Sequence, residues 1–456
     1  MHNFANLIKG FQIFSYHISL KMNVPEYLEK MKNIQNYLLS FVENESNNEE
    51  NYQNFINSFS NLNIPKDYYE IKSIINLIQK IANNHHRSQS FFTKIEQVLI
   101  HIHQRNFFKE IKVFNICKNN KRLLLFLIQN GIIIIDDYIV NIIKKTKYKE
   151  FDYKFYFLPE IIQFLSQDEM NDILQNAEIS QFVTNDMKLK SDFYNKRSIG
   201  ENDDCLCKLI RNDSVTNFET YIKIFNIKLH SKINHSIFET NSFLLKKTPT
   251  LIEYAAFFGS INIFKYLHSN GVELTSSLWL YAIHGRNKEI LLILEKEVIE
   301  PDKITHDDDD YSYDEIEEDD NSFEKCLEES IKCHDHDMTN YILNNYIRDD
   351  VEKFNIENKY DENIISYCFH YYNFNFIPKQ NYGKFYFFYL CEYDHYNLVN
   401  LYLSTKNIKI NETIISKTFI YKQNFQYSFL KFQKLFFSWN LKTKNYSNKI
   451  FFARFK

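Results

Sequence analysis

The chain has 456 residues, a formal net charge of −4 and only seven glycines and six prolines. So few turn-forming residues exclude an α/β or all-β fold with many tight turns, and they favour an all-α protein. The seven cysteines are an odd number spread along the sequence, which argues against a disulfide framework, and no apolar run approaches the roughly 18 residues of a transmembrane helix.

Residues 1–21 contain one early lysine, Lys9, and an apolar stretch broken by polar residues, which makes a poor secretory signal. Met22 directly precedes a helical pattern, so we interpret residues 1–21 as an upstream extension of the gene model. Without a signal or a transmembrane segment, the sequence predicts a cytoplasmic protein.

A helical-hairpin region is expected over residues 22–195. Apolar residues recur at helical spacing in segments 25–41, 67–83 and 89–105. Residues 114–132, FNICKNNKRLLLFLIQNGI, form a degenerate hairpin that ends in Asn-Gly. The hairpins therefore begin well before the middle of the chain.

His85-His86-Arg87 lies between the second and third of these helices. We expect a structural role, in which these side chains cap helix C-termini through hydrogen bonds or positive charge. The alternative is a ligand or catalytic site.

The polar stretch 186–204, which contains Gly200, is the predicted boundary of the repeat core, residues 196–300. Within this core, residues 205–222 predict two short helices. The clearest signal follows over residues 248–300, where one helical hairpin occurs twice, 27 residues apart. The matched pairs are Thr250 with Ser277, Tyr254 with Tyr281, Ala255 with Ala282, Ile263 with Ile290 and Leu267 with Leu294.

In the first copy, Thr250 and Glu253 form a capping box that opens a helix. Ala255 and Ala256 allow close helix approach, and Gly259 breaks the helix where the chain reverses.

Ser260 is expected to cap the second helix, which carries Ile263 and Leu267 on one face and ends at Asn270-Gly271. Two such helices cannot bury their apolar faces alone, so neighbouring hairpins must stack into a solenoid.

Residues 301–322 interrupt the repeats with an acidic run from Asp307 to Asp320. No glycine lies in the run, so it does not match an EF-hand. We expect a disordered, solvated insert, and the alternative is a site for a cation or a basic partner.

Residues 323–412 are predicted to continue the repeats. The positions in register are Ser330, Met338 and Ile342, and then Cys391, Leu398 and Tyr402.

Cysteines and histidines near this point form an alternative zinc set, namely Cys326, Cys333, His334 and His336. Zinc ligands usually come in short paired spacings that this set lacks, as does the pair Cys205 and Cys207. We therefore expect core cysteines and turn histidines, with no metal and no cofactor.

Residues 413–456 contain nine Lys or Arg, no Asp or Glu, and many aromatic residues. Such a segment is typical of a surface that binds nucleic acid or an anionic membrane, or that docks on the acidic insert. We favour a diverged terminal repeat or a frame-shifted end.

The unit at residues 250–271 resembles an ankyrin repeat, whose pattern is T-P-L-H-x-A-A-x-x-G-x-x-x-I-V-x-x-L-L-x-x-G. The matching positions are Thr250, Ile252, Ala255, Ala256, Gly259, Ile263, Leu267 and Gly271. Leu251 stands in place of Pro and Glu253 in place of His. The spacing of 27 is shorter than the usual roughly 33 residues, so the missing length falls in the β-turn finger.

Over roughly residues 22–412 the chain also resembles a divergent ankyrin-like family of protists that carries a domain of unknown function. The resemblance rests on four segments: NNHHRSQSFFTKIEQVL (83–99), CLCKLIRNDSV (205–215), TLIEYAAFFGS (250–260) and CLEESIKCHDHD (326–337).

The resemblance implies a binding scaffold. Ankyrin repeats bind partners through the concave surface of their first helices. Carried over by position, this implies partner contacts at Glu253, Phe257, Phe258, Tyr281, His284 and Arg286. Motifs for phosphate loops, dinucleotides, nucleophile elbows and kinases are lacking. We expect a non-catalytic protein-protein interaction scaffold.

Overall fold

The computed structural model describes most of the chain between residues 23 and 404. The described ranges are 23–44, 49–61, 68–88, 90–105, 107, 113–148, 151–184, 189–301, 322–347, 357–377 and 384–404. The predicted extension (1–21), the acidic run and the basic segment (413–456) lie outside them. The described chain is mostly helical, which confirms the all-α prediction.

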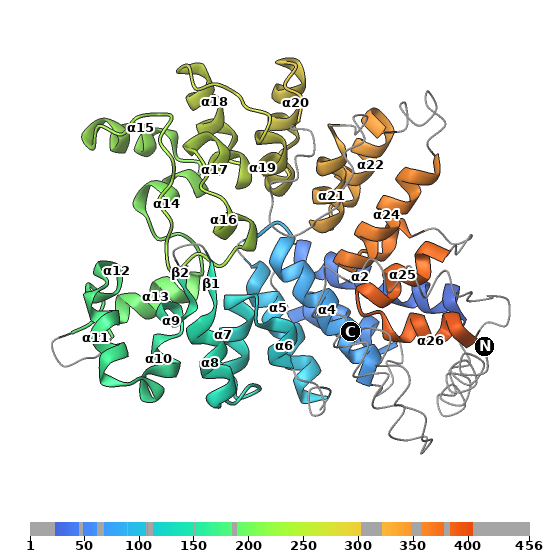
Figure 1. Ribbon diagram of the computed structural model, residues 1–456. Coiled ribbons are helices and arrows are strands. Elements are labelled where there is room, and N and C mark those ends of the chain that lie inside the picture. The colour runs from blue at the N-terminus through green and yellow to red at the C-terminus, as the bar shows by residue number, and fades with distance from the viewer. Residues whose placement is uncertain are drawn as a thin grey trace, which may run out of the picture. The chain divides into compact units, whose positions relative to one another are not determined.

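Helices α2 to α13 make up the N-terminal half (Figure 1). They are α2 (Val24–Glu43), α3 (Glu49–Asn61), α4 (Tyr68–Asn84), α5 (Phe91–Gln104), α6 (Val113–Cys117), α7 (Lys121–Gln129), α8 (Asp137–Lys145), α9 (Tyr153–Tyr156), α10 (Leu158–Ile161), η1 (Ile162–Phe164), α11 (Gln167–Gln175), α12 (Ala177–Ser180) and α13 (Ser191–Ile199). A two-residue antiparallel ladder joins β1 (Lys147–Tyr148) to β2 (Phe151–Asp152).

Helices α14 to α26 follow. They are α14 (Cys205–Arg211), α15 (Val215–Ile224), α16 (Ser242–Lys246), α17 (Leu251–Phe257), α18 (Ile261–Ser269), α19 (Leu278–Gly285), α20 (Lys288–Lys296), α21 (Glu324–Lys332), α22 (His336–Ile342), η2 (Leu343–Ile347), α24 (Glu357–Tyr371), η3 (Phe374–Phe376), α25 (Lys384–Glu392) and α26 (Tyr396–Ser404).

The chain divides into two compact units. Residues 25–305 and 317–379 form one, and the hairpin of α25 and α26 belongs to the other. None of the helices in the described part of the chain has both the length and the apolar character needed to cross a lipid bilayer.

Helical hairpins of the larger unit pack against one another in sequence order. The first helices contact their neighbours in the series α14, α17, α19, α21 and α24, and the second helices α15, α18 and α20 do the same (Figure 1). The apolar repeat positions are fully buried: Ala255, Ala256, Ile263, Leu267, Ala282, Ile290 and Leu294.

One left-handed residue makes each hairpin turn. These residues are Asp213, Gly259, Arg286, His334 and Tyr372, with φ between 49° and 67°. In four of the five turns the two N–H groups of a Schellman motif donate back into the first helix, as Gly259 and Ser260 do to Ala256 and Ala255. The predicted break at Gly259 is thus one instance of a turn that other residue types also adopt.

The capping box at α17 is present. Thr250 N–H donates to Glu253 Oε2 at 2.7 Å, and Glu253 N–H donates to Thr250 Oγ1 at 3.4 Å. The same carboxylate accepts a hydrogen bond from Ser277 Oγ at 2.6 Å, so the cap also links two successive repeats.

The prediction that Ser260 caps α18 is wrong. Its hydroxyl donates to the carbonyl of Ile210 at 2.6 Å instead. Asp213, in the turn of the preceding hairpin, accepts from the N–H groups of Asn262 (3.1 Å) and Ile263 (2.9 Å). A carboxylate in the neighbouring turn supplies the cap because that turn lies against the start of α18.

The predicted register at α25 is wrong by one residue. The turn N–H of His395 donates to Leu390, as that of Ser260 does to Ala255. Leu390 is fully buried and Cys391 is half-buried. Leu390 therefore occupies the repeat position that the sequence assigned to Cys391.

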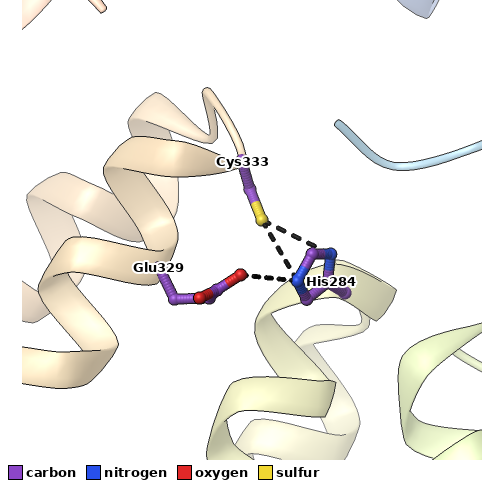
Figure 2. A group of neighbouring side chains, drawn as sticks. All are labelled: His284, Glu329 and Cys333. Atoms are coloured by element: carbon purple, nitrogen blue, oxygen red, sulfur yellow. Dashed lines mark hydrogen bonds and ion pairs between the residues drawn. The ribbon is translucent and has the colours of Figure 1, made fainter. Parts of the chain in front are cut away.

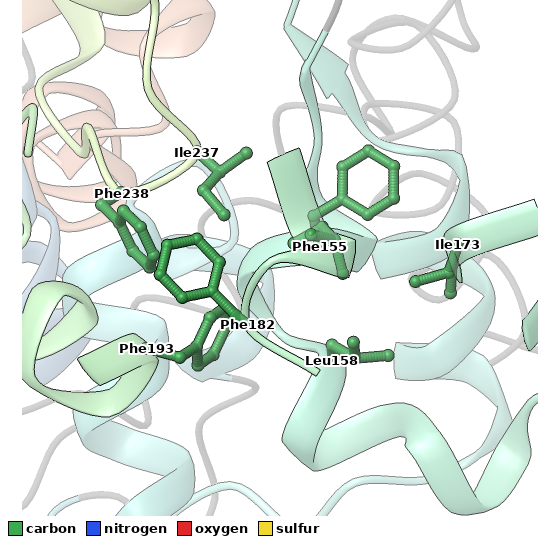
Figure 3. Close-up of a cluster of buried hydrophobic side chains, with 8 residues drawn as sticks. Phe155, Leu158, Ile173, Phe182, Phe193, Ile237 and Phe238 are labelled. Carbon is green, nitrogen blue, oxygen red and sulfur yellow. The ribbon is translucent and has the colours of Figure 1, made fainter. Parts of the chain in front are cut away.

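The predicted boundary at residues 195/196 falls inside α13. An aromatic cluster joins residues on both sides of this boundary (Figure 3). Phe182 and Phe193 precede the boundary, and Phe238 follows it. The rings of Phe182 and Phe193 both lie with their centroids 5.4 Å from that of Phe238. The two segments thus share one core.

The backbones of α17 and α19 meet at two glycines. A Cβ on Gly259 would lie 2.6 Å from the carbonyl oxygen of Gly285, and a Cβ on Gly285 would clash with the carbonyl oxygen of Ala256. Only glycine fits at this contact.

Gly285→Ala is therefore expected to lower the free energy of unfolding by about 3 kcal/mol, the upper range for overpacking, although Gly→Ala in a helix normally gains about 1 kcal/mol. The control is Gly271→Ala, which has φ of 84° but no heavy atom within 4 Å of the added Cβ, and should cost about 1 kcal/mol. Urea unfolding measures both, and equal losses would contradict the close contact.

Val298 follows α20 with φ of 55°, and it is 79% exposed. A β-branched residue is strained in this conformation, so Val298→Gly should raise stability by about 0.5 to 1 kcal/mol. Leu292→Gly, at a 60% exposed site inside α20, should instead cost about 1 kcal/mol. A loss of stability at both sites in thermal unfolding would show that the turn at Val298 is not strained.

Candidate functional site

The His85-His86-Arg87 segment lies between α4 and α5 and meets the repeats. His85 Nδ1 donates to the carbonyl of Cys333 at 2.9 Å, and His86 Nδ1 donates to the carbonyl of His284 at 2.9 Å. These carbonyls lie at the carboxyl ends of α21 and α19, where helices leave acceptors unpaired. The prediction that these histidines cap helix C-termini is confirmed.

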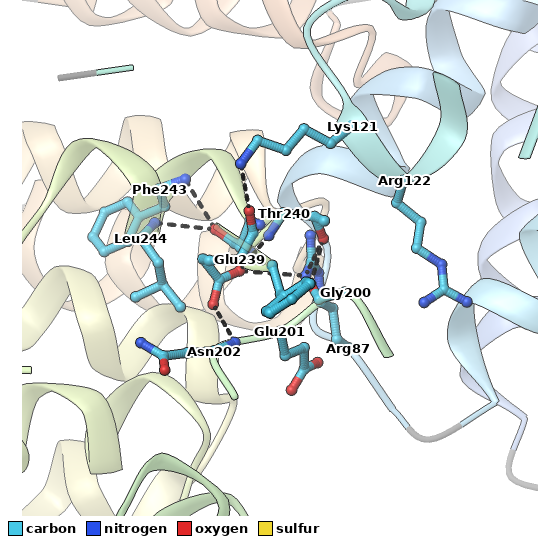
Figure 4. A network of polar contacts seen from close by, with 12 residues as sticks. Arg87, Lys121, Arg122, Gly200, Glu201, Asn202, Glu239, Thr240, Phe243 and Leu244 are labelled. Atoms are coloured by element: carbon cyan, nitrogen blue, oxygen red, sulfur yellow. Dashed lines mark hydrogen bonds and ion pairs between the residues drawn. The ribbon is translucent and has the colours of Figure 1, made fainter. Parts of the chain in front are cut away.

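Arg87 reaches the segment before α16. Its Nη1 donates to Thr240 Oγ1 at 3.1 Å and lies 3.8 Å from Glu239 Oε1 (Figure 4). The guanidinium also stacks over the ring of Phe92. The side chain is only 4% exposed. Three consecutive residues therefore bind three separate elements of the repeat region.

Glu239 is the acceptor at the centre of this polar network (Figure 4). Its carboxylate accepts from the N–H groups of Asn202 (3.2 Å), Thr240 (2.9 Å) and Asn241 (2.7 Å). The buried Lys121 donates to the backbone carbonyl of Glu239 at 3.1 Å. Full hydrogen bonding makes this buried carboxylate a structural anchor.

A second cluster joins α19 to α21. His284 Nε2 lies 2.7 Å from Glu329 Oε1, and Cys333 Sγ lies 3.5 Å from His284 Nδ1 (Figure 2). Lys332 Nζ pairs with both oxygens of Glu329, at 2.9 and 3.0 Å. His284, Glu329 and Cys333 are buried, and Lys332 is half-buried.

The electrostatics of this cluster favour a charged Glu329 beside a charged Lys332, with His284 and Cys333 neutral. Burial raises the pKa of Glu329, but Lys332 and the hydrogen bond from His284 outweigh it and lower the pKa to about 2. Burial lowers the pKa of His284 and raises that of the Cys333 thiol well above its usual value. A buried neutral thiol is a poor nucleophile, so the arrangement does not fit covalent catalysis.

The zinc alternative can be compared with these positions. Of Cys326, Cys333, His334 and His336, only Cys333 joins a set with metal-ligand spacing in the described part of the chain, and its companions are His284 and Glu329. His336 instead contacts Gln35 and Asn375. The carboxylate of the set is already bound by Lys332 and His284, which fits an ion-pair network better than a metal centre.

Three of the four aromatic residues proposed for partner contact pack against Phe243 of α16. Phe257, Tyr281 and His284 surround the ring of Phe243 with centroid distances of 5.8, 5.0 and 4.5 Å. These three are buried, whereas Phe258 is half-buried. The ring contacts of Phe257, Tyr281 and His284 with Phe243 are therefore contacts within the chain itself.

The charged residues of the same set are half-buried. Glu253 belongs to the α17 capping box. Arg286 Nη1 donates to Glu43 Oε1 of α2 at 2.8 Å, and its Nε lies 3.1 Å from Asp335 Oδ2. Among the six predicted contacts, the half-buried Glu253, Phe258 and Arg286 retain surface for a partner, and their role in binding stays a prediction.

Sequence reasoning missed Glu43, Glu239 and Glu329, the acidic partners of the motif and of His284. Glu329 lies four residues before Cys333 and so on the same helix face, which is the only local signal. Glu43 pairs with His85, Glu239 with Arg87 and Glu329 with His284, over separations of 42, 152 and 45 residues, which lie beyond any spacing rule.

Comparisons of the chain with protein-family models, with curated proteins and with solved structures found no match.

His334 gives a prediction about pH. It is 1% exposed, its Nε2 has no hydrogen-bond partner among the described residues, and burial together with His336 and His85 lowers its pKa to about 3. Below the usual pKa of 6.5 the unfolded chain takes up a proton that the folded chain refuses, so stability falls as the pH drops from 6.5 towards 3.

His334→Asn should remove this part of the pH dependence, since asparagine tolerates the φ of 55°. Between pH 7.5 and 5.5 the variant should lose about 1.4 kcal/mol less than the native chain in urea unfolding. The matched control is His230→Asn at an exposed site. If the native and His334→Asn chains lose the same stability over this range, His334 is not held neutral by the fold.

Proposed function

We propose that the protein is an ankyrin-like helical-hairpin solenoid that acts as a non-catalytic protein-protein interaction scaffold. The observation that supports it most is the packing of first helix on first helix through α14, α17, α19, α21 and α24. Repeated hairpins of this kind build extended surfaces from many side chains, which suits recognition of another protein.

The site chemistry is in keeping with this proposal. The buried His284 and Glu329 form a hydrogen bond and ion pair between α19 and α21. The Cys333 thiol is 1% exposed, so substrate has no route to it. These groups stabilise the packing of the hairpins. The half-buried side chains of the first helices and turns are the ones left to bind a protein partner.

Affinity capture with mass spectrometry tests the proposal on the full chain and on a triple variant, Glu253→Gln, Phe258→Leu and Arg286→Gly. Each change preserves the backbone, because glutamine also serves in a capping box and glycine suits the φ of 51° at residue 286. Interface hot spots are worth about 2 kcal/mol or more, so a partner should be captured at least tenfold less by the variant.

The control variant, Glu289→Gln with Val298→Gly, changes exposed sites of α20 and its C-terminal turn. It should capture the partner as the native chain does. Identical partner lists for the native chain and the triple variant, with circular dichroism showing both folded, would remove these first-helix positions from the binding surface.

A further inference from the structure

A small pocket lies where the His85-His86-Arg87 segment meets the repeats. Residues 85–87 and Asn241 line one part, and the rings of Phe257, Phe258 and His284 line the rest. It encloses about 200 Å³, counting space that opens to solvent. Much of this space is open to solvent, and the enclosed part has room for about one water-sized group, so only the end of a side chain can enter it.

Arg87 lines this pocket and has unused donors. Its Nη1 is bound to Thr240, but its Nε and Nη2 are buried and make no hydrogen bond among the described residues. These two N–H groups lie on the same edge of the planar guanidinium. Such an edge matches the two oxygens of a carboxylate, and leaving it unpaired in a buried site is costly.

Asn241 adds a third donor. Its Oδ1 caps α16 by accepting from the N–H groups of Phe243 (2.9 Å) and Leu244 (3.3 Å). Its Nδ2 amide group has no hydrogen-bond partner in the part of the chain that the structure describes. Since Asn241 lines the same pocket as Arg87, the two side chains supply donors to one small space.

We propose that this pocket binds the carboxylate of an acidic side chain from a protein partner, held by Arg87 and Asn241. The assignment rests on the proposed scaffold function and deepens it by naming the chemistry of the partner. Three of the predicted partner residues, Phe257, Phe258 and His284, line the pocket, and Phe258 and His86 keep the exposure that lets a side chain enter.

A single negative charge suits the site better than a phosphate. Glu239 Oε1 lies 3.8 Å from Arg87 Nη1 and already neutralises part of its charge. Glu201, whose side chain pairs with Arg211 at 2.9 Å, adds a further negative charge to the surroundings of Arg87. A doubly charged group would meet repulsion from both carboxylates, whereas a carboxylate fills the two free N–H positions.

Ligand-observed NMR titration of the full chain tests the site with three probes at constant ionic strength. They are acetate, glutamate capped at both ends as N-acetyl-glutamate N-methylamide, and the matching glutamine compound. Acetate and capped glutamate should bind with dissociation constants of about 1 to 10 mM, the range open to so few atoms, and capped glutamine should not bind.

Asn241→Asp is the decisive variant. Aspartate keeps the α16 cap but replaces the free amide with negative charge, so binding should weaken at least tenfold. Asn115→Asp is the charge control, because residue 115 is exposed and its Oδ1 only accepts from Tyr138. Arg87→Lys, which keeps the charge and loses the paired donors, should also abolish binding.

No binding of either carboxylate probe would overturn the site and leave water as its occupant. Equal weakening by Asn241→Asp and Asn115→Asp would also overturn it. Binding of acetate without capped glutamate would overturn the partner side chain as the source. If carboxylates bind but affinity capture finds no protein partner, the scaffold proposal fails while the site stands.

Discussion

The last carbonyl groups of an α-helix need donors from outside the helix, and in this chain two first helices obtain them from one distant turn. His86 donates to the carbonyl of His284 in α19, 198 residues away in sequence, and His85 donates to the carbonyl of Cys333 at the end of α21, 248 residues away. Arg87 extends the same contact to Glu239. Since these donors are consecutive and the side chains of His85 and Arg87 are buried, moving α19 or α21 relative to the N-terminal helices leaves polar groups unpaired.

The hairpins themselves are held by contacts that leave little freedom. Gly259 and Gly285 bring two backbones together, and Asn287 Nδ2 donates to the carbonyl of Gly259 at 3.0 Å across the same turn. Further along, Gln35 of α2 exchanges hydrogen bonds with Asn373 and Phe374 after α24. The repeats are thus aligned both by their neighbours and by helices from the start of the chain.

Local chemistry is what the sequence could predict. The capping box at Thr250, the reversal at Gly259 and the buried faces of α17 to α20 each depend on residues a few positions apart. Ser260 shows the limit, because the cap of α18 comes from Asp213 in another hairpin. Gly285 shows the same limit. Glycine is required at this position because the backbone at the end of α17 lies against it, and nothing in the sequence of α19 indicates this contact.

The site was predictable only in part for the same reason. The capping role of His85 and His86 followed from their place between helices and their donors, but the helices they cap are not their sequence neighbours. The sequence placed Cys333 with Cys326, His334 and His336 in an alternative zinc set, although their spacing argued against a metal. The neighbours of Cys333 in the structure, His284 and Glu329, come together only because α19 packs on α21.

Hydrogen exchange of the full chain carrying Arg87→Ala is the most direct measurement of whether the turn at residues 85–87 joins both regions into one cooperative unit. If it does, amides of α19 and α21 should lose protection together with those of α4 and α5. Faster exchange confined to α4 and α5, with α19 and α21 as protected as in the native chain, would contradict this and make the turn a peripheral contact.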